Sequence, residues 1–278
     1  MEDHFQNIRP LAPEVTPYID SYYFHTSNNP ELSRRLFYYP SYRTALNVYK
    51  NVTVQLEATG RTYLKCDTPY LETVFTNIID HMGYVHLAGD FDKIGILFYP
   101  YGFNAFLPTT LKDFLKGNKV LRFDGLGDAW NEKIQEVFAT DTISNKRDLL
   151  DQIFSSLLQN HMDTRFLQVL DIIEKTDGNI RLHEIAQQLG LHRKTITRWC
   201  NKHLGMPFRE YAGIVKFRRT HERYESNTGQ KLVELAHHSN YYDQADFINH
   251  FKSMSSATPK HLFKSLKSMG AKVYWNYS

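Results

Sequence analysis

The segment Leu182–Lys202, LHEIAQQLGLHRKTITRWCNK, predicts the structure of the C-terminal part of the chain, because its layout returns 50 residues later. The second copy is Leu232–Lys252, LVELAHHSNYYDQADFINHFK. Each copy has apolar residues at helical spacing, then a short break, then a second run at helical spacing. Two helices joined by a short turn are therefore predicted in each copy.

The break in each copy has the residue types that a tight turn between helices needs. Ala186 in the first copy and Ala236 in the second stand four residues before Gly190 and Asn240. Gly and Asn tolerate the left-handed backbone of such a turn. The small alanine lets the two helices approach closely where they cross. We therefore predict two helix-turn-helix units.

The second helix of each unit has an apolar and a polar face. Ile196 and Trp199 are expected to face inward in the first unit, and Phe247 and Phe251 in the second. In helix-turn-helix proteins this helix lies in the major groove of DNA. Arg and Lys can read guanine or hold phosphate, and Gln and Asn can read adenine. The predicted DNA-binding residues are His192, Arg193, Lys194, Thr195, Thr197, Arg198, Tyr242, Asp243, Gln244, Asp246, Asn249 and His250.

Several of these residues have a second interpretation that involves no DNA. Asp243 and Gln244 stand near the start of a helix, where either could cap it instead of reading a base. Arg193, Lys194 and Arg198 could form an ordinary solvated face.

Charge divides the chain in a way that favours the DNA-binding interpretation. Residues 1–160 contain 15 Lys and Arg against 19 Asp and Glu, a balance of −4, whereas residues 161–278 contain 18 against 11, a balance of +7. An acidic front and a basic back indicate that only the back meets a polyanion. A basic helix over Val215–Arg223 (VKFRRTHER) lies between the two units and is expected to set their separation.

The segment Phe166–Phe263 resembles the DNA-binding domain of the AraC/XylS family. Tyr241–Lys252, followed by Thr258-Pro259, is similar to the family signature aromatic-x-Asp-Gln-Ser-x-Phe-x-x-x-Phe-Lys, although Asn240 replaces the usual glycine before it. In the first unit Gly190–His192 stands where the family has Gly, an apolar residue and usually Ser, and Arg198 corresponds to a family arginine.

The resemblance implies an α+β protein that regulates transcription. An N-terminal β-rich, cupin-like or barrel domain (1–160) would sense an effector or mediate dimers. An all-α domain with two helix-turn-helix units (161–270) would follow, joined by the polar junction Gln159–Thr164 and ending in a tail (271–278). The expected partner is double-stranded DNA, with RNA polymerase, an unidentified small-molecule effector and a second copy of the chain (a homodimer) as further candidates. No cofactor or metal is expected.

The N-terminal part is rich in aromatic and β-branched residues separated by turn residues, which favours a β-sandwich or small barrel. The predicted strands are Thr44–Val48, Val52–Leu56, Tyr84–Leu87 and Ile94–Phe98, with turns at 28–30, 39–41 and 88–90. Helical spacing begins near Leu111, with apolar stripes at Ile134, Val137 and Phe138 and at Leu149, Leu150, Ile153, Phe154, Leu157 and Leu158. These stripes favour core packing over a dimer seam.

Four aromatic residues after the last of these strands are the candidate effector-binding residues. Tyr99, Tyr101, Phe103 and Phe106 could line an apolar cavity. They could equally be ordinary core.

Other features exclude several classes of protein. The longest apolar run, Ile94–Tyr99, is far too short to cross a bilayer, and no secretory signal begins the chain. Two cysteines, Cys66 and Cys200, in different domains exclude a disulfide framework and favour a cytoplasmic protein. The sequence contains no His-x-His metal pair, phosphate loop or nucleophile elbow. A small-molecule-binding enzyme and a protein-interaction module are the rival interpretations.

Overall fold

The structure is a computed structural model that describes residues 4–57, 60–66, 70–127, 129–159, 163–227 and 229–265, and the backbone of 267–269 and 273–277. Its strands are β1 His4–Ile8, β2 Ile19–Ser27, β3 Ser33–Tyr38, β4 Thr44–Lys50, β5 Val52–Leu56, β6 Gly60–Lys65, β7 Leu71–Thr76, β8 Gly83–Ala88, β9 Phe91–Phe98, β10 Val120–Arg122, β11 Lys267–Met269 and β12 Val273–Tyr277. Its helices are η1 Gly102–Phe106, α1 Leu111–Leu115, α2 Trp130–Ala139, α3 Ile143–Leu157, α4 Thr164–Lys175, α5 Leu182–Gln188, α6 Arg193–His203, α7 Phe208–Ser226, α8 Leu232–His238, α9 Gln244–Ser255 and α10 Pro259–Ser265.

The N-terminal strands form two sheets. Of the two predicted architectures, a sandwich and a small barrel, the structure is therefore a sandwich. One sheet has the order β1-β2-β9-β4-β7-β10 and the other β11-β12-β3-β8-β6-β5. Neighbours are antiparallel except β6 and β8, which run parallel. Apolar side chains from both sheets, among them Leu36, Tyr49 and Tyr63, pack into one shared cluster. All four predicted strands and the three predicted turns are confirmed.

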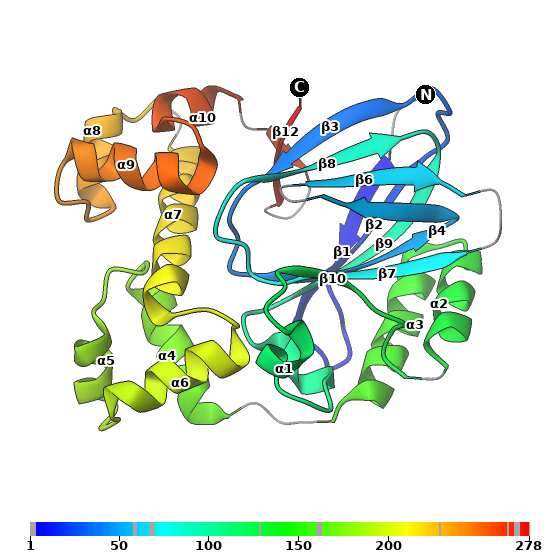
Figure 1. Cartoon of the computed structure of the whole chain (residues 1–278), viewed down its shortest axis with the longest axis horizontal. Coiled ribbons are helices and arrows are strands. Elements are labelled where there is room, and N and C mark those ends of the chain that lie inside the picture. Colours follow the sequence, from blue (N-terminus) through cyan, green and yellow to red (C-terminus); the bar gives the residue numbers. More distant parts are fainter. Residues whose placement is uncertain are drawn as a thin grey trace.

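The first sheet is buried on both faces, as the alternation along β9 shows. Ile94, Ile96 and Phe98 pack toward the helices, whereas Lys93 lies in the interior between the sheets. Successive side chains of a strand point to opposite faces, so one strand serves two different environments. Helices α2 and α3 lie together on the outer face (Figure 1). The predicted helical stripes pack into this core, so the preference for core packing is confirmed.

The C-terminal helices form two smaller cores around the long helix α7 (Figure 1). The first combines α4, α5 and α6 with α7, and also includes Tyr42, Ile78 and Tyr101 of the N-terminal domain. The second combines α7 to α10 and includes Tyr39 of the N-terminal domain. The two parts of the chain therefore share buried apolar surface. Residues 160–162 of the predicted junction lie outside the described residues.

The prediction of a tail over residues 271–278 is wrong for the residues that the structure describes there. β12 pairs antiparallel with β3, with Trp275 opposite Tyr38 and Tyr277 opposite Leu36. β3 borders β8 on its other side, so without β12 it would be an edge strand with open backbone groups. The end of the chain thus returns to the N-terminal domain, which turn and helix signals do not reveal.

Three further observations bear on the excluded classes. Neither Cys66 nor Cys200 forms a disulfide bond. Within the described residues, no helix has both the length and the apolar character needed to cross a bilayer. In the same part of the chain, no group of three His, Cys, Asp or Glu side chains is placed to hold a metal ion.

Candidate nucleic-acid interface

Both predicted turns are left-handed, and the same backbone hydrogen bond closes them. Gly190 has a φ of 61° and Asn240 a φ of 55°. In each unit the amide of the residue after the left-handed position donates to the carbonyl of the alanine four residues before that position. The donor–acceptor distance is 2.8 Å to Ala186 and 3.0 Å to Ala236. Both alanines are buried, which allows the two helices of each unit to meet closely. The prediction of two matched helix-turn-helix units is confirmed.

The inward side of each second helix is buried, with one difference from the prediction. Helix α6 buries Ile196 and Cys200, and α9 buries Phe247 and Phe251. Trp199, which was expected to face inward, is half-buried and packs against the first helical core, with its ring centre 5.8 Å from that of Phe166. Its counterpart in the second unit is not Phe251, because that unit has one extra residue between turn and helix. Equivalent positions are 50 residues apart up to the turn and 51 apart after it, so Cys200 is the counterpart of Phe251.

The second helix of each unit, α6 or α9, begins with a side-chain cap. The Lys194 amide donates to Nδ1 of His192 at 3.2 Å, and the Asp246 amide donates to Oδ1 of Asp243 at 2.7 Å. A side-chain acceptor at this position satisfies an amide that has no partner within the helix. His192 therefore caps the helix at the position where the AraC/XylS family usually has serine. Of the two roles open for Asp243, the structure shows capping, while Gln244 is exposed.

The exposed face of α6 is strongly basic and longer than the sequence analysis indicated. Its exposed residues are Arg193, Lys194, Thr197, Arg198, Asn201 and Lys202, with Thr195 half-buried. The sequence analysis missed Asn201 and Lys202. The four-residue repeat of Lys194, Arg198 and Lys202 could have found the second of them, since such residues share one face of a helix.

The exposed face of α9 is polar but hardly basic. Its exposed residues are Gln244, Ala245, Asp246, Asn249, Lys252 and Ser253, and Tyr242 before the helix is 93% exposed. The placement of His250 on this face is wrong. Its Nδ1 lies 2.8 Å from the Tyr241 hydroxyl, and its ring packs edge-on against Phe217. Burial lowers the pKa of His250 to about 4, so the ring is neutral at pH 7.

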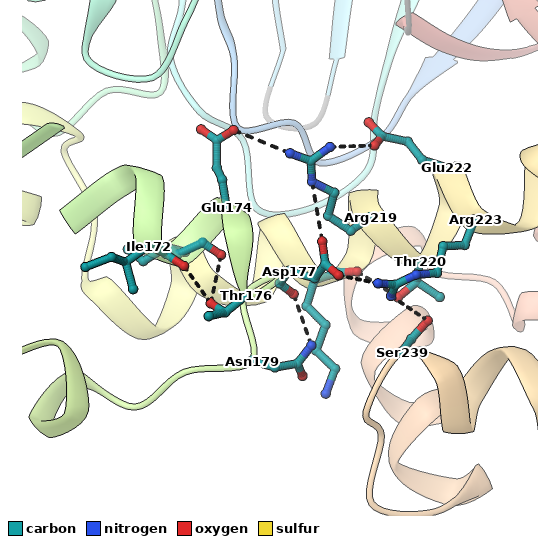
Figure 2. A network of polar contacts seen from close by, with 12 residues as sticks. Ile172, Glu174, Thr176, Asp177, Asn179, Arg219, Thr220, Glu222, Arg223 and Ser239 are labelled. Carbon is teal, nitrogen blue, oxygen red and sulfur yellow. Dashed lines mark hydrogen bonds and ion pairs between the residues drawn. The ribbon is translucent and has the colours of Figure 1, made fainter. Parts of the chain in front are cut away.

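A network of ion pairs fixes the first unit to the second through α7 (Figure 2). Arg219 of α7 lies 3.5 Å from the carboxylate of Glu174 at the end of α4 and 3.7 Å from that of Asp177. Arg223, one turn later, pairs with Asp177 and reaches the Ser239 hydroxyl beside the second turn at 3.5 Å. Several shared, half-buried partners make such a network firmer than isolated surface pairs. It therefore contributes to the orientation of the two units.

Three polar side chains hold the DNA-binding domain to the N-terminal domain. Asn77 Nδ2 donates to the carbonyl of Leu204 at 3.0 Å, and Asn104 Nδ2 donates to that of His203 at 2.9 Å, both at the end of α6. The guanidinium of Arg218 in α7 donates to two carbonyls of the loop between β3 and β4.

These contacts bring α6 beside α1 of the N-terminal domain, as Figure 1 shows. An open cleft separates the exposed face of α6 from the start of α1. It is lined by Lys194, Thr197, Arg198, Asn201 and Lys202 on one side and by Thr110, Lys112 and Asp113 on the other. The surface expected to contact DNA therefore faces the N-terminal domain.

The prediction that four aromatic residues line an effector cavity is wrong. Phe103 and Phe106 are fully buried in the core beneath the helices, and Tyr101 packs against Phe166 and His203 at the domain interface. The half-buried Tyr99 lies near Arg43. Phe103 and Phe106 belong to the short 3-10 helix η1 that follows β9, and they pack with residues of α2 and α3 in this core. The alternative of ordinary packing is the correct one for Phe103 and Phe106.

A different cavity lies between the two sheets, at the end that faces α7. Its walls include Arg61 of β6, Lys93 of β9 and Arg218 of α7. The sequence analysis missed these residues. A charged residue in the inward register of β9, among Phe91, Gly95 and Leu97, was the available signal.

Comparison with known proteins supports the helical domain. Residues 185–265 match the family described as helix-turn-helix domain. No curated protein sequence matches the chain. Among solved structures, unsaturated fatty acid-bound ToxT from Vibrio cholerae is 13% identical and covers 98% of this chain and 97% of its own, with a TM-score of 0.43. The C-terminal domain of AraT, a response regulator from Geobacillus stearothermophilus, is 18% identical and covers 41% of this chain and 93% of its own, with a TM-score of 0.36. No residue role or ligand is transferred from these structures.

Proposed function

We propose that this chain, a DNA-binding transcription regulator with an AraC-type helix-turn-helix domain, places α6 and α9 in successive major-groove faces on one side of a duplex. The observation that carries the proposal is the matched pair of turns. Both have the same left-handed residue position and the same closing hydrogen bond, and they present two second helices along α7. A second helix held in this way is the element that enters the groove in such proteins.

The two helices would contribute differently to binding. Arg193, Lys194 and Arg198 on α6 can hold phosphates, and an arginine can also bind guanine through two hydrogen bonds. On α9, Gln244 and Asn249 can read adenine. The exposed carboxylates of Asp246 on α9 and of Asp243 just before it repel phosphate. We therefore assign most of the affinity to α6 and a larger part of base discrimination to α9.

The proposal includes control by the N-terminal domain. The major groove is about 12 Å wide and has phosphates on both sides, so a helix inside it needs free space on both flanks. α1 of the N-terminal domain lies across the cleft that the exposed face of α6 lines, so it would compete with a duplex for this space. DNA binding would then require the two domains to separate, with loss of the contacts that Asn77, Asn104 and Arg218 make. A ligand that favours one arrangement would shift the equilibrium between them.

The test is Arg198→Ala in the full chain, measured by mobility shift on a duplex selected from a randomised pool. If Arg198 reads a base, its loss should weaken binding by about 1–3 kcal/mol, which is roughly 5- to 150-fold. The matched control is Lys50→Ala, which removes one exposed positive charge from the N-terminal domain. Affinity equal to wild type, with the fold intact, would remove Arg198 from the interface.

Salt dependence tests the interface as a whole. Phosphate contacts release counterions from DNA, so affinity should fall steeply between about 50 and 200 mM salt. A flat titration would contradict DNA binding as the main activity.

A further inference from the structure

The cavity between the sheets is enclosed largely by side chains of the N-terminal domain and closed by one residue of the DNA-binding domain. It holds about 100 Å³. Tyr23, Tyr63 and Leu97 form part of its wall within the sandwich, and Arg218 reaches it from α7.

Two buried cations, Lys93 and Arg61, face this cavity. Lys93 is 5% exposed and Arg61 is 6% exposed. Within the described residues, neither forms an ion pair with a carboxylate. Arg61 donates from Nη1 to the Thr76 hydroxyl at 2.8 Å, but its buried Nε has no acceptor in that part of the chain.

The groups around Lys93 compensate its charge only weakly. Its Nζ lies 5.2 Å, 5.3 Å and 5.8 Å from the ring centres of Tyr23, Tyr49 and Tyr63. The nearby hydroxyls are already engaged, since that of Tyr23 donates to Asn47 and those of Tyr49 and Tyr63 bond to each other. Burial, with a smaller contribution from Arg61, lowers the pKa of Lys93 to about 7.

A buried charge without a partner is costly, and two of like sign in one cavity are more so. We propose that this cavity is a binding site for a small organic anion, whose negative group lies between Arg61 and Lys93. An anion would supply the missing acceptor and the missing counter-charge together. Packing alone explains neither cation, because an apolar residue of similar size would fill the same space at lower cost.

The size and lining of the cavity narrow the ligand class. An apolar cavity of about 150 Å³ admits benzene, so about 100 Å³ admits roughly four to six non-hydrogen atoms. Ala45, Val85 and Leu97 offer an apolar surface for the rest of the molecule. A short carboxylic acid fits both features.

Two residues that line this cavity also make hydrogen bonds that hold the domains together. Asn77, which donates to the end of α6, and Arg218, which donates to the loop between β3 and β4, both line it. An anion beside them would compete with the carbonyls that they now bind. This regulatory part rests on the proposed function, whereas anion binding itself does not.

Titration calorimetry of the full chain tests binding. The probes are acetate, pyruvate, inorganic phosphate and sulfate, with acetamide as the neutral analogue of acetate. We expect a carboxylate to bind and acetamide not to bind. Lys93→Met and Lys93→Gln should each weaken the carboxylate at least tenfold, and Lys50→Met, an exposed lysine on the neighbouring strand β4, should leave it unchanged. Absence of carboxylate binding, binding of phosphate or sulfate alone, or equal binding by the Lys93 variants would overturn the assignment.

The effect of the anion on DNA binding is tested by measuring affinity for the selected duplex with and without the carboxylate that binds. A change in DNA affinity of at least threefold, lost in Lys93→Met, is expected. An unchanged affinity would refute the regulation while leaving the anion site in place. A failure of DNA binding both with and without the anion would instead refute the proposed function.

Discussion

Replacement of Lys93 by methionine should make the chain more stable at neutral pH, although Lys93 is buried and surrounded by rings. The pKa of this amine falls from its ordinary value of 10.5 to about 7 in the folded state, first because of burial and second because of Arg61. The folded value lies below the unfolded value. The unfolded chain therefore binds more protons between pH 7 and 10.5, and the free energy of unfolding rises with pH across that window.

The magnitude follows from this difference. One pH unit corresponds to about 1.4 kcal/mol. The half-protonated amine at pH 7 therefore lowers the free energy of unfolding by roughly 4 kcal/mol relative to a neutral side chain. Methionine loses the contacts of the ammonium with three tyrosine rings, each worth about 0.5–1 kcal/mol. The net gain expected for Lys93→Met at pH 7 is about 2 kcal/mol.

The assay is urea unfolding of wild type, Lys93→Met and Lys50→Met at pH 7 and pH 9.5. We expect a higher midpoint for Lys93→Met at pH 7, a smaller gap at pH 9.5, and no gain for the exposed Lys50. A lower stability of Lys93→Met at pH 7 would refute the reasoning, because it would mean that the ammonium stabilises the fold. A gain in stability together with a loss of anion binding would identify a residue kept for its ligand.

Two further predictions concern the helical domain. Asn104→Ala removes a hydrogen bond at the end of α6, worth about 0.5–1.5 kcal/mol, and should raise DNA affinity roughly two- to tenfold in mobility shifts; an affinity no higher than wild type would argue that the domains need not separate. Gly190→Ala should lower the free energy of unfolding by about 1–2 kcal/mol in urea, through the left-handed backbone alone, since no atom lies within 4 Å of the added methyl group. A neutral result there would show that the turn relaxes.

The contact between α6 and α1 changes how the DNA-binding surface is understood. From the sequence, Lys194 and Arg198 belong to an exposed helix that is ready to meet DNA. In the structure, Asp113 lies across the cleft from both. Under the proposed function, this arrangement would limit access of α6 to a groove, and the domain contacts would take part in regulation.

The local features of the DNA-binding domain could be predicted because neighbouring residues determine them. A left-handed position requires Gly or Asn, and Gly190 and Asn240 both take it. Helical spacing identified Phe247 and Phe251 as core. Helical spacing also placed Trp199 against the core, where the ring is half-buried. It did not reveal the additional loop residue of the second unit, which makes Cys200 the counterpart of Phe251.

Local sequence was enough to predict the two helix-turn-helix units, the β-rich front and the basic face of α6, because periodicity and turn residues act over a few positions. It did not reveal that Arg61, Lys93 and Arg218 meet at one cavity, that His250 is half-buried beside Tyr241, or that β12 returns to β3. These features depend on the pairing of segments far apart in the chain. Such pairing is set by the fit of whole surfaces, which no short stretch of residues encodes.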